Sequence, residues 1–284
     1  MPPSTSPTLR QRRLGSELRK LRQQAGLTAT AAAALLGVNQ AQISSIEAGR
    51  YPVSADRVRS FARSYDCADE ALVDALAAMT GGRTRGWWDE YQGLPLPAGL
   101  NDVAELEHHA SGLRVALVTH IPALLQTTDY ARALFQEVVP PLRQYEVEHR
   151  LSHRIKRQGV LHQDSPPSYT AIVHETALRI GFGGPTVTRA QLRHLLEMSE
   201  LPNVTFRVIP FGQASFPGSG QSVDYVMGPV PQLDTVLLDT HHGSEFLDSE
   251  PELAAYRSLL SRLESASLSP AASRDLMRGL TRDT

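Results

Sequence analysis

Apolar residues within the first eighty positions recur at helical spacing in a series of short runs. Leu14, Leu18 and Leu21 are separated by four and then three residues, which places them on one helix face, and Gly26 follows where a glycine commonly ends a helix. Three further helices are predicted by residues that can cap their N-termini, namely Thr28, Asn39 and Ser54. A fifth is expected over about Asp69–Met79. The pattern predicts an all-α N-terminal domain over residues 9–79.

The second and third of these helices are short, and the turn between them contains Gly37. Two short helices joined by a tight turn are typical of the helix-turn-helix, in which the second helix of the pair enters the major groove of DNA. Ile43 and Ile46 are predicted to face the core of the domain rather than DNA. The spacing therefore predicts a helix-turn-helix.

The distribution of charge separates this region from the rest of the chain. Residues 1–63 contain ten Arg or Lys residues and three acidic residues, whereas the remaining positions contain 18 basic and 27 acidic residues. A basic segment joined to an acidic remainder suggests an anion-binding module attached to a second domain. A charged, solvent-facing helix surface would give the same count, so charge alone leaves both interpretations open.

The segment from Leu14 to Tyr65 gives a more specific indication. It contains Ala25–Gly26–Leu27–Thr28 and Leu36–Gly37–Val38 in one register, and it resembles the phage-repressor-like (XRE) helix-turn-helix. The resemblance implies DNA binding. One departure is that Ala29 and Thr30 stand where this family usually has a glutamine, which holds a DNA phosphate, followed by an acidic residue.

The resemblance also implies which side chains face DNA. The base-contacting surface is expected at Asn39, Gln40, Ala41, Gln42, Ser44 and Ser45. A glutamine can pair with N6 and N7 of adenine, which makes Gln40 a candidate for base recognition. Because this helix carries no Lys or Arg, phosphate contacts are expected elsewhere, and the candidates are Arg10, Arg12, Arg13, Thr28 and Arg50. Glu47 is predicted to be a structural acid near Arg19 or Arg22.

Beyond residue 80 the composition changes. Residues 80–86, with three glycines and two arginines, are predicted to form a linker. Helices are expected at about 101–111, 127–136, 141–161, 186–198, 249–266 and 269–280, and strands at about 113–118, 169–173, 204–209, 222–227 and 235–238. Because the order shows no repeating βαβ unit, the pattern predicts a larger α+β domain over residues 87–284.

This second domain also resembles part of a known group of proteins. Its stretches RGWWDEY, IPALLQTTDYARAL and LPNVTFRVIPF resemble the C-terminal domain of actinobacterial regulators that are described as antitoxin-like, several of them encoded beside a small acidic partner protein. We predict that the most specific residues of these stretches converge in one concave region that receives a partner or ligand. They are Trp87, Trp88, Tyr91, Gln126, Asp129, Tyr130 and Arg132. Packing of the two tryptophans in the core is the alternative interpretation.

The candidates for catalytic or metal-binding chemistry fail individually. His149 and His153 have the i, i+4 spacing of metal ligands, but no zincin-type glutamate stands between them, so solvent-facing or partner-facing histidines are the better interpretation. His174–Glu175 begins an HExxH-like pattern that Leu178 breaks, and His241–His242 fits a turn at a strand end. The single cysteine excludes an intrachain disulfide. We expect no metal, no cofactor and no enzymatic activity.

Three hypotheses about function follow. The first is a transcriptional regulator that binds a palindromic site on double-stranded DNA as a homodimer and whose second domain binds a partner protein to control DNA binding. In the second hypothesis that domain senses a small-molecule effector, and in the third the chain is an interaction module that has lost DNA binding. Because no secretory signal and no apolar run of about 20 residues is present, we expect a cytoplasmic protein without membrane contact.

Overall fold

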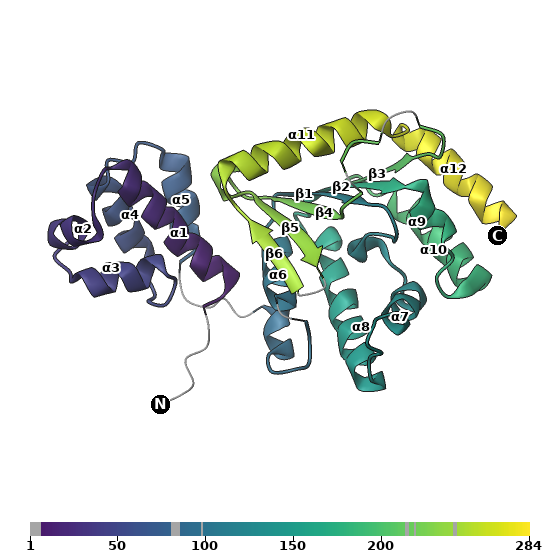
Figure 1. Cartoon of the computed structure of the whole chain (residues 1–284), viewed down its shortest axis with the longest axis horizontal. Helices are drawn as coiled ribbons and strands as arrows, with labels where there is room; N and C mark the ends of the chain where they lie inside the picture. The colour runs from purple at the N-terminus through teal and green to yellow at the C-terminus, as the bar shows by residue number, and fades with distance from the viewer. Residues whose placement is uncertain (1–6, 81–85, 98, 214–215, 219, 241–242) are drawn as a thin grey trace. The chain divides into compact units, whose positions relative to one another are not determined.

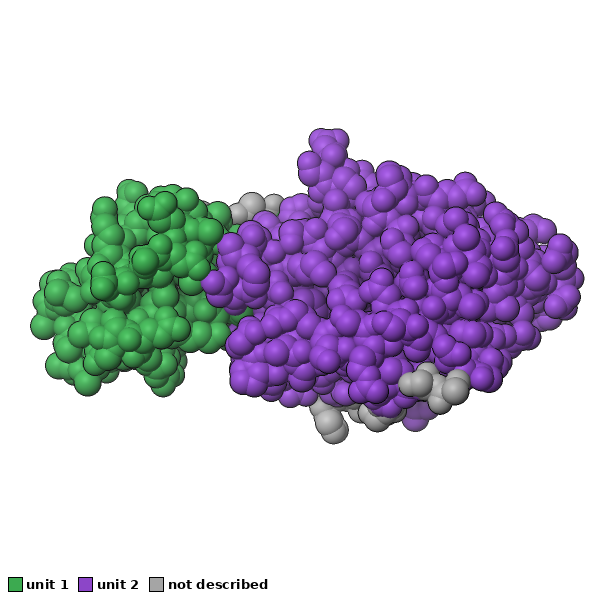
Figure 2. Space-filling view, turned by 90° about the horizontal axis from the view of Figure 1, so that it is seen from above, with its two compact units in different colours: residues 1–86 green, residues 87–284 purple. Residues whose placement is uncertain are grey.

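The computed structural model describes residues 7–80, 86–97, 99–213, 216–218, 220–240 and 243–284. The chain divides into two compact units, which we call unit 1 (residues 1–86) and unit 2 (residues 87–284) (Figure 2). The described part of unit 1 is helical, and unit 2 combines helices with a sheet (Figure 1). The predicted all-α domain followed by a larger α+β domain is therefore confirmed. Most of the predicted linker, and the pair His241–His242, lie outside the described residues.

Unit 1 consists of short helices that begin at capping residues. Its helices are α1 (Leu9–Gln24), α2 (Ala29–Leu35), α3 (Gln40–Glu47), α4 (Ala55–Ser64) and α5 (Glu70–Ala78). The side chains of Thr28, Asn39 and Ser54 accept hydrogen bonds from the first turns of α2, α3 and α4, as predicted. Each cap satisfies a backbone N–H that the helix itself leaves without a partner.

Two glycines let α1 approach the end of α3 closely. A Cβ added to Gly15 would lie 2.5 Å from the carbonyl oxygen of Glu47 and 2.6 Å from that of Ile46. Gly49 ends α3 with a left-handed backbone (φ +72°), and a Cβ there would lie 2.9 Å from the backbone of Gln11. The position of α3 on α1 therefore depends on the absence of a side chain at both positions.

The sheet of unit 2 has six strands in the order β3-β2-β1-β4-β5-β6. Its strands are β1 (Gly112–Leu117), β2 (Ser168–His174), β3 (Val204–Ile209), β4 (Val223–Met227), β5 (Thr235–Thr240) and β6 (Gly243–Leu247). Strands β1, β2 and β3 are parallel, whereas β4, β5 and β6 extend the sheet in antiparallel pairs. The parallel half is built from two βαβ crossovers. The sequence pattern predicted neither these crossovers nor strand β6.

Helices cover both faces of this sheet (Figure 1). They are α6 (Leu100–His108), α7 (Thr128–Gln136), α8 (Gln144–Gln158), α9 (Glu175–Arg179), α10 (Gly184–Met198), α11 (Glu250–Ala266) and α12 (Pro270–Asp283), with short 3-10 turns that include η1 (Trp87–Tyr91) and η2 (Ala123–Leu125). Helix α11 packs on the face that carries Ile172, Tyr225 and Val236. On the opposite face Val115 and Phe206 join a core shared with α10 and α12. Both faces are therefore covered by helices over the central strands, whereas Asp239 and Thr240 at the end of β5 are exposed.

The outer edge of β3 is occupied by the segment that joins α11 to α12. The backbone N–H of Leu268 donates to the carbonyl of Val208 at 2.8 Å, and the N–H of Val208 donates to Oγ of Ser273 at 3.0 Å. Among the residues that the structure describes, strand β6 at the other end of the sheet pairs with β5 alone. The two edges of the sheet therefore differ. In the part of the chain that the structure describes, no helix is long and apolar enough to cross a membrane.

Candidate nucleic-acid interface

Helix α3 has a buried face and an exposed N-terminal end. Ile43 and Ile46 are buried in unit 1, whereas Asn39, Gln40 and Ala41 are exposed. The remaining predicted contact residues are half-buried, namely Gln42, Ser44 and Ser45. The N-terminal end of α3 therefore presents polar and small side chains to solvent. In a helix-turn-helix this is the end that contacts base edges.

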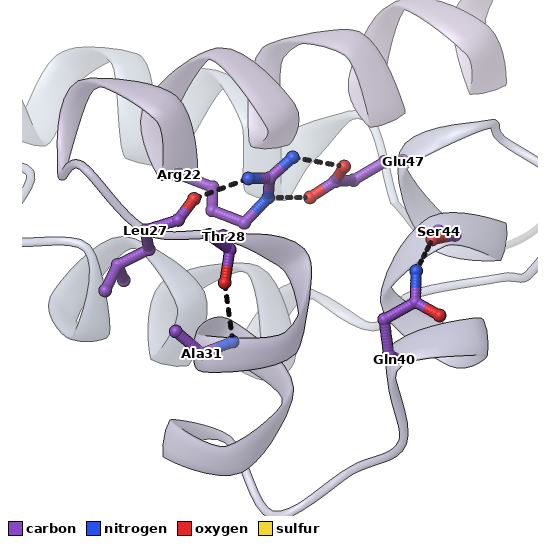
Figure 3. Close-up of polar contacts among 7 residues, drawn as sticks. All are labelled: Arg22, Leu27, Thr28, Ala31, Gln40, Ser44 and Glu47. Carbon is purple, nitrogen blue, oxygen red and sulfur yellow. Dashed lines mark hydrogen bonds and ion pairs between the residues drawn. The ribbon is translucent and has the colours of Figure 1, made fainter.

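The two glutamines of α3 are held in different ways. Nε2 of Gln40 donates to Oγ of Ser44 at 2.8 Å, along the same helix (Figure 3). With its oxygen turned toward α4, the amide of Gln42 accepts from both terminal nitrogens of the Arg57 guanidinium at 3.2 Å. Arg57 also lies over the ring of Phe61, 5.6 Å from its centroid. Sequence analysis missed Arg57 because only the fold brings α4 beside α3.

A buried ion pair connects α1 to α3. Arg22 donates through Nε to one oxygen of Glu47 at 2.6 Å and through a terminal nitrogen to the other at 3.0 Å (Figure 3). Its second terminal nitrogen donates to the carbonyl of Leu27 at 2.6 Å, in the connection to α2. The hydrogen bonds to Glu47 raise the pKa of Arg22, so its guanidinium stays charged. Glu47 is thus the structural acid that the sequence predicted, and it fixes the C-terminal end of α3.

The arginines predicted to contact phosphates differ in their surroundings. Arg12 and Arg50 are exposed, and a terminal nitrogen of Arg12 donates to the carbonyl of Pro7 at 2.7 Å. The half-buried Arg10 donates to the carbonyl of Ala78 at 3.0 Å. The prediction for Arg13 was wrong, because its side chain is only 7% exposed and lies 3.0 Å from the carboxylate of Glu17 one helical turn away. Charge counts along the sequence cannot separate such internal pairs from an exposed basic surface.

The predicted concave region of unit 2 does not form from the predicted residues. Trp88 and Tyr91 are buried in an aromatic cluster with Trp87, and the hydroxyl of Tyr91 lies 2.6 Å from Oγ of Ser152. Tyr130 belongs to the main core instead, where its hydroxyl accepts from the N–H of Ile121 at 3.2 Å. Burial raises the pKa of Tyr130 to about 12, so it stays protonated. Trp88 and Tyr130 are therefore interior residues of two different clusters, whereas Trp87 is half-buried.

The other three predicted residues of this group also separate from one another. Gln126 is buried, donates to the carbonyl of Ile121 at 2.6 Å and accepts from Arg154 at 2.5 Å. Asp129 is exposed, and Arg132 forms an ion pair with Glu148 at the surface. The prediction of one shared cavity was wrong. Side chains that are close in sequence at the start of a helix point in different directions around it, so the predicted residues are divided between the core and solvent.

Family models match both units of the chain. Residues 13–76, which span most of α1 through α5, match a helix-turn-helix domain. Residues 100–279, well over half of the chain, match a domain of unknown function (DUF5753). The chain belongs to the DUF5753 family. Comparison with curated proteins and with solved structures gives no match. In this DUF5753 protein the helix-turn-helix stands first, so the chain is a DNA-binding regulator.

The DUF5753 unit contains a buried ion pair that the sequence did not single out, and a buried histidine that it did. Arg157 on α8 is paired with Glu107 on α6 by hydrogen bonds of 2.8 and 2.6 Å, with both side chains buried. His153 is fully buried between Trp87 and Tyr91, so the expectation of a solvent-facing or partner-facing histidine was wrong for this residue. Burial lowers the pKa of His153 to about 3, which keeps the imidazole neutral. Arg157 and His153 both lie on the buried face of α8, one helical turn apart.

Proposed function

We propose that this protein is a transcriptional regulator that recognises a palindromic operator through α3 of unit 1. The observation that carries the proposal is the division of α3 into a buried face, with Ile43 and Ile46, and an exposed N-terminal end, with Asn39, Gln40 and Ala41. The first residues of a recognition helix are those that reach base edges in the major groove. The buried pair of Arg22 and Glu47 supports this role because it holds the helix in place before DNA arrives.

Gln40 is the proposed base reader. Its amide is held by Ser44 in the free protein, and adenine would replace this single hydrogen bond by two, to N6 and N7. Gln42, whose amide faces Arg57, is proposed to act together with that arginine rather than alone. Ala41 offers only a methyl contact, which suits thymine.

Phosphate contacts are assigned to the exposed residues that flank the recognition helix. Arg50 follows the end of α3, Arg12 lies on α1, and the exposed Thr28 caps α2. Contacts of this kind attract DNA of any sequence and weaken as salt is added, because they release counterions. We therefore expect Arg50→Gln to reduce affinity for all duplexes alike and to make the dependence of affinity on salt less steep.

The experiment begins with selection of binding sites for the full chain from a pool of random duplexes. Affinity for the selected site is then compared between Gln40→Ala and Gln24→Ala, in which an exposed glutamine of α1 is changed as the matched control. Gln40→Ala should cost about 1–3 kcal/mol and abolish preference at one base pair. Equal binding and equal base preference of the two variants would show that Gln40 does not read DNA. Failure to enrich any site would favour the hypothesis of an interaction module that has lost DNA binding.

Unit 2 is proposed to control this activity. One helix-turn-helix covers one half-site, so a palindromic operator calls for a homodimer, which light scattering of the full chain tests. Control by a protein partner, such as a small acidic protein, is supported by the resemblance to antitoxin-like regulators, and co-purification tests it. Control by a small-molecule effector has a specific structural observation in its favour, a charged cavity in unit 2. The proposal places the protein in the cytoplasm and assigns it no catalysis.

A further inference from the structure

A cavity of about 140 Å³ lies within unit 2, between the sheet and the helices α6 and α8. Apolar side chains make up most of its wall, including Leu113 and Val115 of β1 and Leu237 of β5. Charged and polar residues enter it from four directions. They are Glu107 of α6, Arg154 and Arg157 of α8, Gln126 and His120 of the loop after β1, and Tyr169, Asp224 and Asp239 of the sheet.

The two aspartates occupy positions that the sheet otherwise fills with core residues. Asp224 of β4 stands opposite Val115 of β1 and Leu237 of β5, and Asp239 follows Leu237 by two residues on β5. Residues two apart on a strand share a face, so both carboxylates lie on the face that is covered by α6 and α8, where Asp224 is half-buried and Asp239 is exposed at the end of β5. A carboxylate at such a position lowers stability unless a counter-charge or hydrogen bonds compensate it. A function of these carboxylates would explain why the face retains them.

Some polar groups around the cavity are saturated, and others are not. Arg157 and Glu107 form two hydrogen bonds with each other and need no further partner. By contrast, two groups on the cavity wall have no hydrogen-bond partner among the described residues. They are the hydroxyl of Tyr169, a residue that is 1% exposed, and the carboxylate of Asp224. Because both groups line the cavity, a ligand bound there would supply the partner that the described residues do not.

Arg154 adds a positive charge to the same wall. Its guanidinium donates one hydrogen bond, to the amide oxygen of Gln126 at 2.5 Å, and lies 4.8 Å from the ring centroid of Phe135. No carboxylate of the described residues forms an ion pair with it. Burial and the charge of Arg157 lower the pKa of Arg154 to about 9, while burial and the charges of Asp239 and Glu107 raise the pKa of Asp224 to about 7. Both shifts mean that each charge would gain from a counter-ion.

We propose that this cavity binds a small amphoteric molecule, a free α-amino acid with an aliphatic side chain. Its ammonium group pairs with Asp224 and Asp239, its carboxylate pairs with Arg154, and its side chain contacts the leucines and valines of the wall. The volume is close to that of cavities that hold about six to nine non-hydrogen atoms, which is the size of valine or leucine. The hydroxyl of Tyr169 completes the polar contacts. Binding itself does not depend on the proposed function, whereas any effect of the amino acid on operator affinity does.

The test uses isothermal titration calorimetry of the full chain with three probes at millimolar concentration. They are L-leucine, 3-methylbutylamine, which lacks the carboxylate, and 4-methylpentanoic acid, which lacks the ammonium group. L-valine and L-isoleucine are titrated as further members of the class. We expect saturable binding of at least one of the amino acids and binding at least about tenfold weaker for the amine and the acid, because each leaves a buried charge without its partner.

Three variants locate the site. Asp224→Asn and Arg154→Gln should each weaken binding by about tenfold or more, and Tyr169→Phe, which removes only the hydroxyl, by several-fold. The matched controls are Asp129→Asn and Arg193→Gln, which change exposed residues of α7 and α10 and should bind as the parent does. Thermal unfolding of each variant verifies its fold, and Tyr169→Phe keeps the test decisive if a charge variant is unstable.

The outcomes separate this inference from the proposed function. Absence of binding by all three amino acids, equal binding of leucine, the amine and the acid, or unchanged binding by folded Asp224→Asn and Tyr169→Phe would each overturn the ligand site. Operator affinity is measured separately, with and without the amino acid. Binding that leaves operator affinity unchanged supports the site and contradicts its role in regulation, whereas a chain that binds amino acid and no DNA contradicts the proposed function alone.

Discussion

Replacement of Gly15 by alanine tests the contact that positions the recognition helix. The new Cβ would lie 2.5 Å from the carbonyl oxygen of Glu47, and ordinary van der Waals contact begins near 3.4 Å. The end of α3 must therefore move away from α1 by about 0.9 Å, which is the difference between these distances. A backbone carbonyl in a helix cannot rotate aside as a flexible side chain can, so the strain falls on the packing of the two helices.

The size of the effect follows from two opposing contributions. Overpacking of a core contact costs about 1–3 kcal/mol, and we expect the upper end because backbone atoms of two residues are involved. Alanine gains about 1 kcal/mol over glycine inside a helix, which leaves a net loss of about 2 kcal/mol. For a unit of this size the loss corresponds to a decrease of roughly 8–16 °C in melting temperature. Movement of Glu47 also strains its hydrogen bonds to Arg22, so operator affinity should decrease too.

Hydrogen exchange of the full chain, read by mass spectrometry on peptides from α1 and α3, measures the stability of unit 1 separately from that of unit 2. Gly279→Ala in α12 is the matched control, since no atom lies within 4 Å of its added Cβ. That variant should gain up to about 1 kcal/mol from helix propensity alone. If Gly15→Ala protects α3 as well as the parent does, or better, the close approach of α1 and α3 is wrong and so is our account of how the helix is held.

Two further predictions concern buried charge. Glu47→Gln should destabilise unit 1 by about 3 kcal/mol in the same exchange assay, because it leaves Arg22 without its counter-charge. The control Asp74→Asn disrupts an exposed pair with Arg59 and should cost less than about 1 kcal/mol. Similar losses in the two variants would contradict the role of burial. His153 has a folded pKa of about 3 and an ordinary value of 6.5, so its contribution to stability is complete above pH 6.5 and decreases as the pH falls toward 3. At pH 5 the loss in the free energy of unfolding, measured with urea, is about 2 kcal/mol. His153→Leu should remove this pH dependence, whereas His149→Leu should keep it. Equal slopes of stability against pH in the two variants would refute the buried neutral imidazole.

The features that sequence predicted well are those set by neighbouring residues. Thr28, Asn39 and Ser54 cap their helices because a cap involves only the next three residues. Ile43 and Ile46 fall on the buried face of α3 for a similar reason, since helical periodicity is local. The exposed and buried faces of the recognition helix could therefore be assigned before the structure was known.

The features that sequence did not predict depend on which elements meet in space. Val223, Asp224 and Tyr225 alternate in polarity as they would in a strand with one face in water. Both faces of this sheet are covered by helices, however, so Asp224 is a half-buried carboxylate on the wall of a cavity. The charge pattern predicts a phosphate contact at Arg13, because the sequence does not distinguish its partner Glu17 from any other acid one turn away. Tyr130 was grouped with the tryptophans by resemblance, although it packs in a different core cluster.

The unequal edges of the sheet have a consequence for self-association. A strand edge with free N–H and C=O groups can pair with another copy of the same protein. Here the segment between α11 and α12 occupies β3 at Val208, which leaves β6 as the edge at which a second chain can add. Two chains that paired through β6 would leave the β3 edges at both ends, and each of these edges is covered at Val208. Further pairing at Val208 would require the α11–α12 segment to leave β3, so this segment opposes open-ended growth of the sheet by that route.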